Sequence, residues 1–353
     1  MAPPLKDQFG PVVVERIADT LPVDRDSFIA ACLSGFADLE LMARARHVAD
    51  VMHTHLDPDP AVAVQQVHTA IGTERLPGMS AFFYNPHSAF IGAYGLPAFD
   101  ASMAAMYDLT KVFTAEFCVR PFLQEDPRTM DHLRAWAGDP DEHVRRLVSE
   151  GTRPRLPWAQ RLPGFIADPQ PVIELLDLLK DDGSDYVLRS VGNNLNDISK
   201  DHPELAVEVA SRWSPGRAAL IRRGLRTLIK DGDPAALAVL GYAPNPATAH
   251  ADLPTEIAIG DTLPLAVELR GHGKVLLDIA VHFVKANGTT SRKIFKGGEV
   301  DLAGTAVIRR TISFAQHSTR RHYPGPHRVE ALINGRTQEL GVVQVRPTPV
   351  SPA

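Results

Sequence analysis

Apolar residues follow two different spacings along the chain. Up to about residue 245 they recur at helical intervals, as in Val144, Leu147 and Val148, with Gly and Pro between the groups. From Leu253 onward, short segments rich in Val and Ile are separated by turn residues, which is typical of strands. The pattern therefore predicts a multidomain chain, with an all-α region over residues 1–245 and a small all-β domain over residues 254–348.

The β domain is expected to contain strands at residues 263–269, 275–284, 306–314, 327–335 and 340–345. Turns are expected at Gly271-His-Gly273 and at Asn287-Gly288, and the segment APNPATAHADLP is expected to be a linker. A length of about 95 residues suits an immunoglobulin-like β-sandwich, although the pattern also permits a barrel.

The helical region contains a loose internal repeat. Aligning the segments VRRLV (144–148), VLRSV (187–191) and LIRRG (220–224) superposes Arg146, Arg189 and Arg222. Their spacings, 43 and 33 residues, bracket those of HEAT-like helix pairs. Such pairs stack into a solenoid whose equivalent positions line one concave face, so we predict a HEAT-like solenoid for residues 1–245.

The stretch SVGNNLNDISKDHP (190–203) predicts a helix with an unusual number of short polar side chains. Asn and Asp are poor in helix interiors because they compete for backbone hydrogen bonds. At 100° per residue, Val191, Leu195 and Ile198 form a buried stripe, and Asp197 falls at its edge. The polar face can serve a ligand, but Asp197 and Asp201 can equally cap the helix expected to begin at His202-Pro203.

Composition and charge narrow the class of protein. The 353 residues are 44% hydrophobic and 22% charged, as in a globular protein, and no apolar run approaches the roughly 18 residues of a membrane span. With an N-terminus that does not resemble a signal peptide, we expect a cytoplasmic protein. The net charge of −5 disfavours indiscriminate polyanion binding, but residues 250–353 carry 13 Lys/Arg against 9 Asp/Glu. Cys32 and Cys118 are too few for a disulfide framework and are expected to be buried.

One segment, EGTRPRLPW (150–158), combines an acid, two arginines fixed by prolines, and a tryptophan. Trp158 can stack on a base or sugar, or it can fill a gap between helix pairs. Glu150-Gly151 can be an ordinary helix end with its glycine cap. A metal site is not expected, since His53 and His55 face different sides of a helix, and no phosphate-binding loop or nucleophile motif is present.

Three stretches, RRLVSEGTRPRLPW, SVGNNLNDISKDHPE and LKDQFG, resemble the AlkC family of DNA alkylation-repair glycosylases, which belong with the AlkD-like HEAT-repeat enzymes. The resemblance covers the helical region, and the β domain is similar to the immunoglobulin-like module of some AlkC proteins. It implies hydrolysis of the N-glycosidic bond of cationic N-methylated bases in duplex DNA, chiefly 3-methyladenine, and 3-methylcytosine or 1-methyladenine. It also implies monofunctional action on bent DNA without deep base flipping, no metal or other cofactor, and no obligate protein partner. A monomer is expected.

The resemblance also assigns roles to residues. Glu150 and Asp197 are the leading catalytic carboxylates, with Glu116 as a third, and the candidates for lesion contact are Trp158, Asn193 and Asn194. The candidates for DNA binding are Arg153, Arg155, Arg189, Lys200, Arg222, Arg226, Arg320 and Arg321. Carboxylates suit this chemistry because a cationic base is a good leaving group, and the enzyme must mainly stabilise an oxocarbenium-like sugar and position a water.

A rival hypothesis is a non-catalytic HEAT scaffold that binds DNA or protein, since most helical repeats of this kind are binding surfaces. Phosphate binding would weaken steeply with salt, whereas binding through an apolar protein interface would not. The β domain has two open interpretations as well: contact with a DNA groove, or a tethered module without that role.

Overall fold

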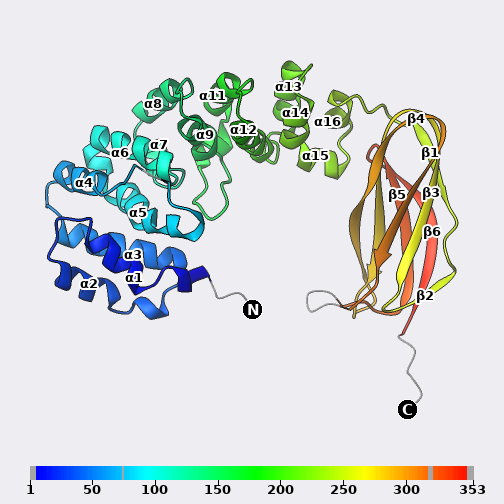
Figure 1. Cartoon of the computed structure of the whole chain (residues 1–353). Helices are drawn as coiled ribbons and strands as arrows, with labels where there is room; N and C mark the ends of the chain where they lie inside the picture. Colours follow the sequence, from blue (N-terminus) through cyan, green and yellow to red (C-terminus); the bar gives the residue numbers. More distant parts are fainter. Residues whose placement is uncertain (1–4, 74, 317–320, 348–353) are drawn as a thin grey trace, which may run out of the picture. The chain divides into compact units, whose positions relative to one another are not determined.

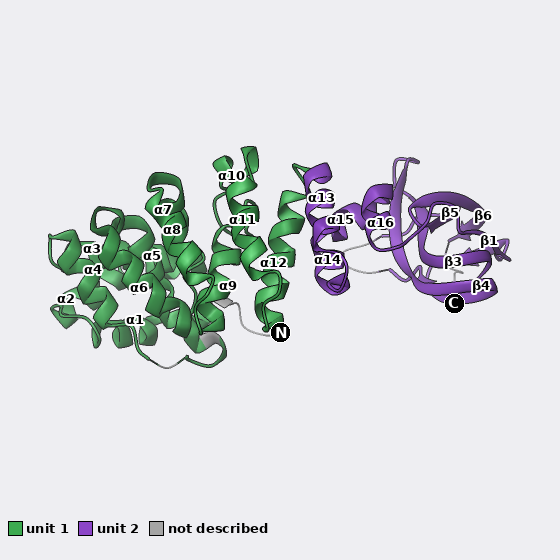
Figure 2. Ribbon diagram, turned by 90° about the horizontal axis from the view of Figure 1, so that it is seen from above, with its two compact units in different colours: residues 1–202 green, residues 203–353 purple. Residues whose placement is uncertain are grey.

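The structure, a computed structural model, describes residues 5–73, 75–316 and 321–347 (Figure 1). The chain forms two compact units, residues 1–202 (unit 1) and residues 203–353 (unit 2) (Figure 2). The division between the units therefore falls about 40 residues before the change from helices to strands.

Unit 1 is helical throughout its described residues. Figure 2 shows its helices side by side in roughly chain order, as expected of a helical repeat. The α-helices are α1 (Pro11–Ala18), α2 (Arg25–Leu33), α3 (Leu41–His55), α4 (Pro60–Thr69), α5 (Asn85–Tyr94), α6 (Phe99–Val112), α7 (Val119–Glu125), α8 (Arg128–Trp136), α9 (Glu142–Gly151), α10 (Pro163–Ala167), α11 (Gln170–Leu179) and α12 (Asp185–Ile198). Short 3-10 helices are η1 (Leu5–Gln8), η2 (Phe36–Asp38), η3 (Gly78–Tyr84) and η4 (Leu96–Ala98).

Helices α9 and α12 pack against each other and begin with side-chain caps. Asp141 accepts a hydrogen bond from the backbone N–H of His143, and Ser184 accepts one from that of Tyr186. Both caps satisfy donors that a helix start leaves free. The predicted stripe of α12 is confirmed, since Val191, Leu195 and Ile198 are at most 1% exposed.

Unit 2 begins with four helices and ends with six strands. The helices are α13 (Pro203–Trp213), α14 (Ala218–Gly224), α15 (Arg226–Asp231) and α16 (Pro234–Val239). The strands are β1 (Ala247–Ala251), β2 (Glu256–Ala258), β3 (Thr262–Val284), β4 (Thr290–Ser313), β5 (Gly325–Ile333) and β6 (Arg336–Arg346). The expected turn at Asn287-Gly288 is confirmed, and it joins β3 to β4.

The turn expected at Gly271-His-Gly273 is wrong, because β3 runs through it as one strand of 23 residues paired with β4. Gly271 and Gly273 have φ values of 153° and 93°, so these glycines let the strand bend without ending. The expected linker is also partly a strand: β1 lies inside it and pairs with β3. The side chains of β1 alternate in burial, but the buried ones are alanines, so the hydrophobic pattern in the sequence is weak.

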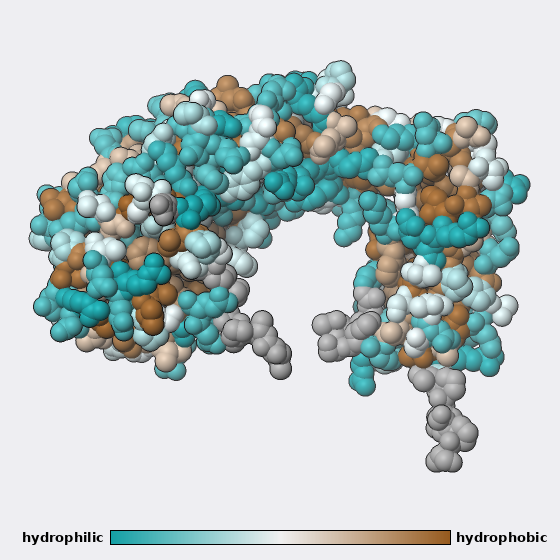
Figure 3. Space-filling model, viewed as in Figure 1, coloured by the Kyte–Doolittle hydropathy of each residue, from teal (hydrophilic) through white to brown (hydrophobic). Residues whose placement is uncertain are grey.

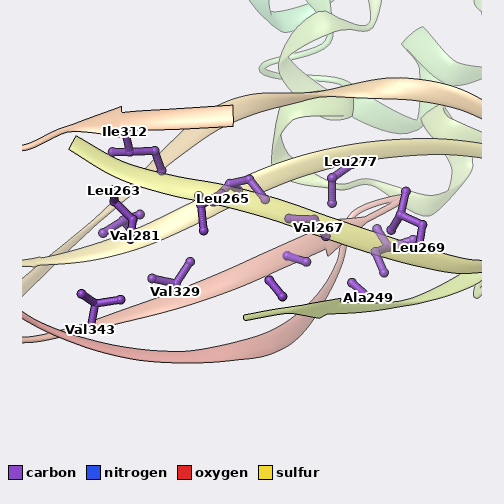
Figure 4. Close-up of a cluster of buried hydrophobic side chains, with 14 of the residues drawn as sticks. Ala249, Leu263, Leu265, Val267, Leu269, Leu277, Val281, Ile312, Val329 and Val343 are labelled. Carbon is purple, nitrogen blue, oxygen red and sulfur yellow. The ribbon is translucent and has the colours of Figure 1, made fainter. Parts of the chain in front are cut away.

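All six strands belong to one hydrogen-bonded sheet that encloses the core of the β domain. The first part of β3 pairs with β1 and the last part with β5, so the long β3–β4 ribbon connects both sides of the domain. Figure 4 shows side chains from several of these strands meeting in this core. Alternate residues of the first part of β3 point inward, and these are Leu263, Leu265, Val267 and Leu269.

Within unit 2, the helices are fastened to the sheet by polar contacts. Arg222 of α14 donates to Glu299 of β4 over 2.9 Å, and the Tyr242 hydroxyl donates to the same carboxylate over 2.7 Å. Asn334, in the turn between β5 and β6, donates to the carbonyl of Ala243 over 2.8 Å. Arg222 therefore joins α14 to β4, while Tyr242 and Ala243 join the segment between α16 and β1 to the strands and their turn.

Among the described residues, no helix is long and apolar enough to cross a membrane. The same residues contain no group of three or more His, Cys, Asp or Glu placed to hold a metal ion. Cys32 and Cys118 are buried free thiols, as predicted, and burial raises the pKa of each to about 12.

Candidate active site

Three carboxylates from separate segments of unit 1 meet in one network of ion pairs. Arg153 links two of them: its Nη1 lies 2.6 Å from Glu150 Oε1, and its Nε lies 2.8 Å from Asp197 Oδ2. Lys200 Nζ lies 2.9 Å from the other oxygen of Asp197. Glu150 and Asp197 are each the last residue but one of their helices, α9 and α12, so packing of these two helices fixes the geometry.

Arg146 extends the network to the third carboxylate. It forms an ion pair with Glu116 and lies 3.6 Å from Glu150 Oε1, while Thr114 donates to Glu116 over 2.8 Å. Burial alone would lower the pKa of Arg146 and of Arg153, but the carboxylates outweigh it and hold both pKa values above the ordinary one. The positions of these charges are therefore fixed before any ligand arrives.

A ladder of small polar side chains supports the network from the α9–α12 interface. Ser149 donates to Ser190 over 2.7 Å, and Ser190 donates to Glu150 Oε2 over 2.6 Å. The Asn194 amide donates to the carbonyl of Ser149 and to the hydroxyl of Thr152. These bonds explain why α12 contains short polar residues where a helix would ordinarily carry apolar or long charged ones.

A pocket of about 920 Å³ opens beside the network. Glu116, Glu150 and Arg153 lie in its lining, whereas Asp197 does not and is only 1% exposed. Most of the wall is apolar, formed by Leu41, Met42, Phe82, Phe113, Phe117, Leu156, Pro157 and Trp158. A pocket with apolar walls and a few convergent charges is the usual form of a small-molecule or cofactor site.

The loop between α9 and α10 carries Trp158, whose side chain is 84% exposed at a φ of 64°. A non-glycine residue at positive φ is strained, and an exposed tryptophan gains little from burial. The loop is held by Arg120, which donates to the backbone carbonyls of Gly151, Arg153 and Gln160. Burial, aided by the charge of Arg153, lowers the pKa of Arg120 to about 10. Burial of the Arg120 charge is energetically unfavourable, and in return its hydrogen bonds fix a loop that presents the exposed Trp158 ring.

The structure brings together four predicted residues, namely Glu116, Glu150, Asp197 and Trp158. Asn194 is not among them, because it is fully buried between α9 and α12, so the lesion contact expected of it does not fit its position. Asn193 is half-buried on α12. Trp158 is exposed and does not fill a gap between helix pairs. Glu150 lies near the end of α9 but also forms ion pairs with Arg146 and Arg153.

The predicted DNA-binding residues lie in different environments. Arg153 is 6% exposed between two carboxylates, which does not fit a phosphate contact. Arg155 forms a two-bond ion pair with Asp201. Arg189, Lys200, Arg226 and Arg321 are exposed, Arg222 belongs to the contact between the helices and the sheet of unit 2, and Arg320 lies outside the described residues.

Sequence reasoning missed two functional-site arginines. Arg146 entered the sequence analysis only as a repeat position, and Arg120 was not assigned a role there, although both bind within the candidate site. The i,i+4 spacing of Arg146 and Glu150 places both on one face of α9, and this signal would have found Arg146. No local signal identifies Arg120, because its partners are backbone carbonyls up to 40 residues away.

The fold and site define a helical-repeat protein with a carboxylate-lined pocket and a C-terminal β domain. Two family models match it: one described as a DNA alkylation repair enzyme, over residues 109–212, and one described as the C-terminal Ig-like domain of the uncharacterised protein YhaZ, over residues 248–347. The uncharacterized protein YhaZ of Bacillus subtilis (strain 168) is 41% identical over 261 residues, which are 71% of this chain and 73% of YhaZ.

A solved structure matches almost the whole chain. It is the Pseudomonas fluorescens alkylpurine DNA glycosylase AlkC, bound to DNA containing an abasic site analog. The sequences are 33% identical, the match covers 98% of this chain and 100% of that one, and the TM-score is 0.80. The chain belongs to the AlkC-type family of DNA alkylation-repair glycosylases. The predicted fold class, a helical region followed by an immunoglobulin-like β domain, is confirmed.

Proposed function

We propose that this protein hydrolyses the N-glycosidic bond of cationic N-methylated bases in double-stranded DNA, namely 3-methyladenine and 3-methylcytosine or 1-methyladenine, and leaves an abasic site. The observation that carries the proposal is the pocket in which Glu116 and Glu150 lie beside the exposed Trp158. Further support comes from AlkC, which is an alkylpurine glycosylase and is bound to DNA with an abasic site analog.

The pocket suits cleavage of a bond whose leaving group is already cationic. As the bond between C1′ and the base nitrogen breaks, its electron pair neutralises the departing base and positive charge develops on the sugar. The fixed carboxylates of Glu116 and Glu150 stabilise that charge, because they are held in place by Arg146 and Arg153 and need no reorganisation. Water then attacks C1′, and a carboxylate accepts its proton.

The geometry suggests different roles for the three acids. Glu116 and Glu150 line the pocket and would act on the sugar and the water. Asp197 is buried, and its oxygens accept from Arg153 and Lys200, so its proposed role is to position Arg153. Trp158 would contact the cationic base through its ring face, by cation–π attraction and dispersion.

Phosphate contacts are assigned to exposed cations. Arg189 of unit 1, and Arg226 and Arg321 of unit 2, are exposed and would neutralise the DNA backbone without reading sequence, whereas Lys200 is already paired with Asp197. Binding that depends on them should weaken as the salt concentration rises.

The test is release of free base from duplex DNA that contains 3-methyladenine or 3-methylcytosine, measured under single-turnover conditions. We expect Glu150→Gln and Glu116→Gln to slow release by about 10²–10³-fold, the usual effect of removing one preorganised electrostatic group. Glu299→Gln is the matched control, because Glu299 is also a carboxylate paired with an arginine but lies in unit 2, where it does not line this pocket. Release by none of the proteins, with DNA binding intact, would reject the glycosylase and favour the non-catalytic scaffold.

A further inference from the structure

A second exposed apolar side chain lies at the candidate active site. Figure 3 shows that the visible surface of the helices is mostly hydrophilic, with apolar side chains in small separate groups. Large apolar side chains that are strongly exposed in unit 1 include Val12, Met42, Val62, Trp158 and Leu178. Of these five, Met42 and Trp158 line the 920 Å³ pocket.

Met42 and Trp158 also line a neighbouring cavity of about 280 Å³. Phe117 and Asn85 belong to both linings too, so these four side chains form a partition between the two spaces. Asn85 is 6% exposed, and its amide Nδ2 has no hydrogen-bond partner within the structure. The partition therefore combines two exposed apolar groups with a buried polar group whose bonding is incomplete.

The position of Met42 in α3 is unusual for an apolar residue. It is the second residue of the helix and 44% exposed, and the first turn of α3 contains no acidic side chain. The exposed first turn of a helix usually favours polar or acidic residues, because they bind its free N–H groups and complement its dipole. Packing of α3 does not require Met42, since the helix is held through Arg44, Ala45, Val48 and Met52.

We propose that Met42 is a second apolar contact to damaged DNA, which packs beside Trp158 against the sugar and base at the lesion and keeps that base step open. This inference rests on the proposed function. A glycosylase that does not draw the base into a deep pocket must still separate the lesion from its neighbours to reach C1′, and apolar side chains commonly fill such opened steps. Methionine suits this place because its unbranched side chain adapts to irregular shapes.

The experiment compares Met42→Ala and Met42→Gln with Val62→Ala. Val62 is a matched control, because it is 43% exposed, lies on α4 of the same unit and does not line either space. We expect Met42→Ala and Met42→Gln to lower single-turnover base release at subsaturating enzyme by about tenfold, since each removes the apolar area that DNA would bury. Met42→Leu, of similar volume and polarity, should restore release, and Val62→Ala should match the wild type.

A second readout does not depend on turnover. In a duplex with an abasic analogue and 2-aminopurine beside it, unstacking by the wild type should raise 2-aminopurine fluorescence, and Met42→Ala should reduce that rise while Val62→Ala does not. The inference is overturned if the wild type releases base and Met42→Ala equals Val62→Ala in both assays. A wild type that releases no base would reject the proposed function instead, and the fluorescence assay would still decide whether Met42 contacts DNA.

Discussion

Arg153 in unit 1 and Arg222 in unit 2 were assigned the same role from sequence, but their surroundings differ. The Arg153 side chain is 8% exposed, lies between Glu150 and Asp197, and borders the candidate active site. The Arg222 side chain is 38% exposed and binds Glu299 and Tyr242, where α14 meets β4. Arg153 lies in the candidate active site, whereas Arg222 joins α14 to β4.

This difference shows that a cationic side chain in a helical repeat must be judged by the partners it already has. An arginine at a regular repeat position is a candidate phosphate ligand only if no carboxylate within the protein has already engaged it. Both arginines have raised pKa values, in each case because neighbouring acidic groups outweigh burial. The shared direction of the pKa therefore does not distinguish a site arginine from a structural one, whereas exposure and position do.

The largest expected effect on stability comes from removing Arg153, the cation that Glu150 and Asp197 share in the candidate active site. Arg153→Met should lower the free energy of unfolding of unit 1 by about 3–5 kcal/mol, because it leaves the buried carboxylates of Glu150 and Asp197 without their common partner. Hydrogen exchange measured by mass spectrometry should show faster exchange in α9 and α12, while the strands of unit 2 are unchanged. Unchanged protection of α9 and α12 would show that the network does not stabilise the helix pair.

A smaller effect is expected at the contact in unit 2. Arg222→Met should cost about 1 kcal/mol or less, because Arg222 and Glu299 are each more than a third exposed and water replaces part of the lost interaction. Exchange should rise near α14 and β4 and remain unchanged in α9. Base release should fall much less than in Glu150→Gln; an equal fall would contradict the division of roles between the two arginines.

The two units also differ in how well sequence alone predicted them. Periodicity located the helices and most strands, because each buried stripe repeats at 3.6 or 2 residues, as in Val191 and Leu195 or Leu263 and Leu265. The sequence pattern failed at Gly271 and Gly273, where a turn was expected. Glycine occurs both in turns and at bends within a continuous strand, so the sequence does not distinguish the two. For β1, alternating alanines gave too little contrast.

In the candidate site, the predicted acids lie close together, whereas several of the predicted DNA-binding cations are bound to carboxylates within the protein. Glu150 and Asp197 were predicted to be carboxylates of one site, and both bind Arg153. Arg153 binds Asp197 and Arg222 binds Glu299, and these partners lie 44 and 77 residues away along the chain. No local sequence pattern indicates contacts at such separations. The burial of Asn194 was not foreseen for the same reason, since its amide donates to the Ser149 carbonyl in α9.

The smallest expected effect on stability concerns a second, more exposed ion pair in unit 1, between Arg155 and Asp201. Arg155 and Asp201 follow Arg153 and Asp197 along the same loop and helix end, but their side chains are 26% and 18% exposed, against 8% and 1% for the inner pair. The hydrogen bonds from Arg155 hold the pKa of Asp201 below its ordinary value of 3.8. As the pH falls, the unfolded chain therefore binds a proton at this carboxyl before the folded chain does.

It follows that the stability from this outer pair is complete well above pH 3.8 and is lost as the pH falls through the lower folded-state pKa. Asp201→Asn should thus reduce the free energy of unfolding at pH 7 by about 1 kcal/mol or less, and the difference from wild type should shrink between about pH 5 and pH 3. Urea unfolding across that range measures it, with Asp38→Asn as a control, because Asp38 is an exposed carboxylate of unit 1 on η2. A difference that does not shrink at all by pH 3 would mean that the Asp201 side chain acts through packing rather than through its charge, and the inner and outer pairs would then differ in kind as well as in exposure.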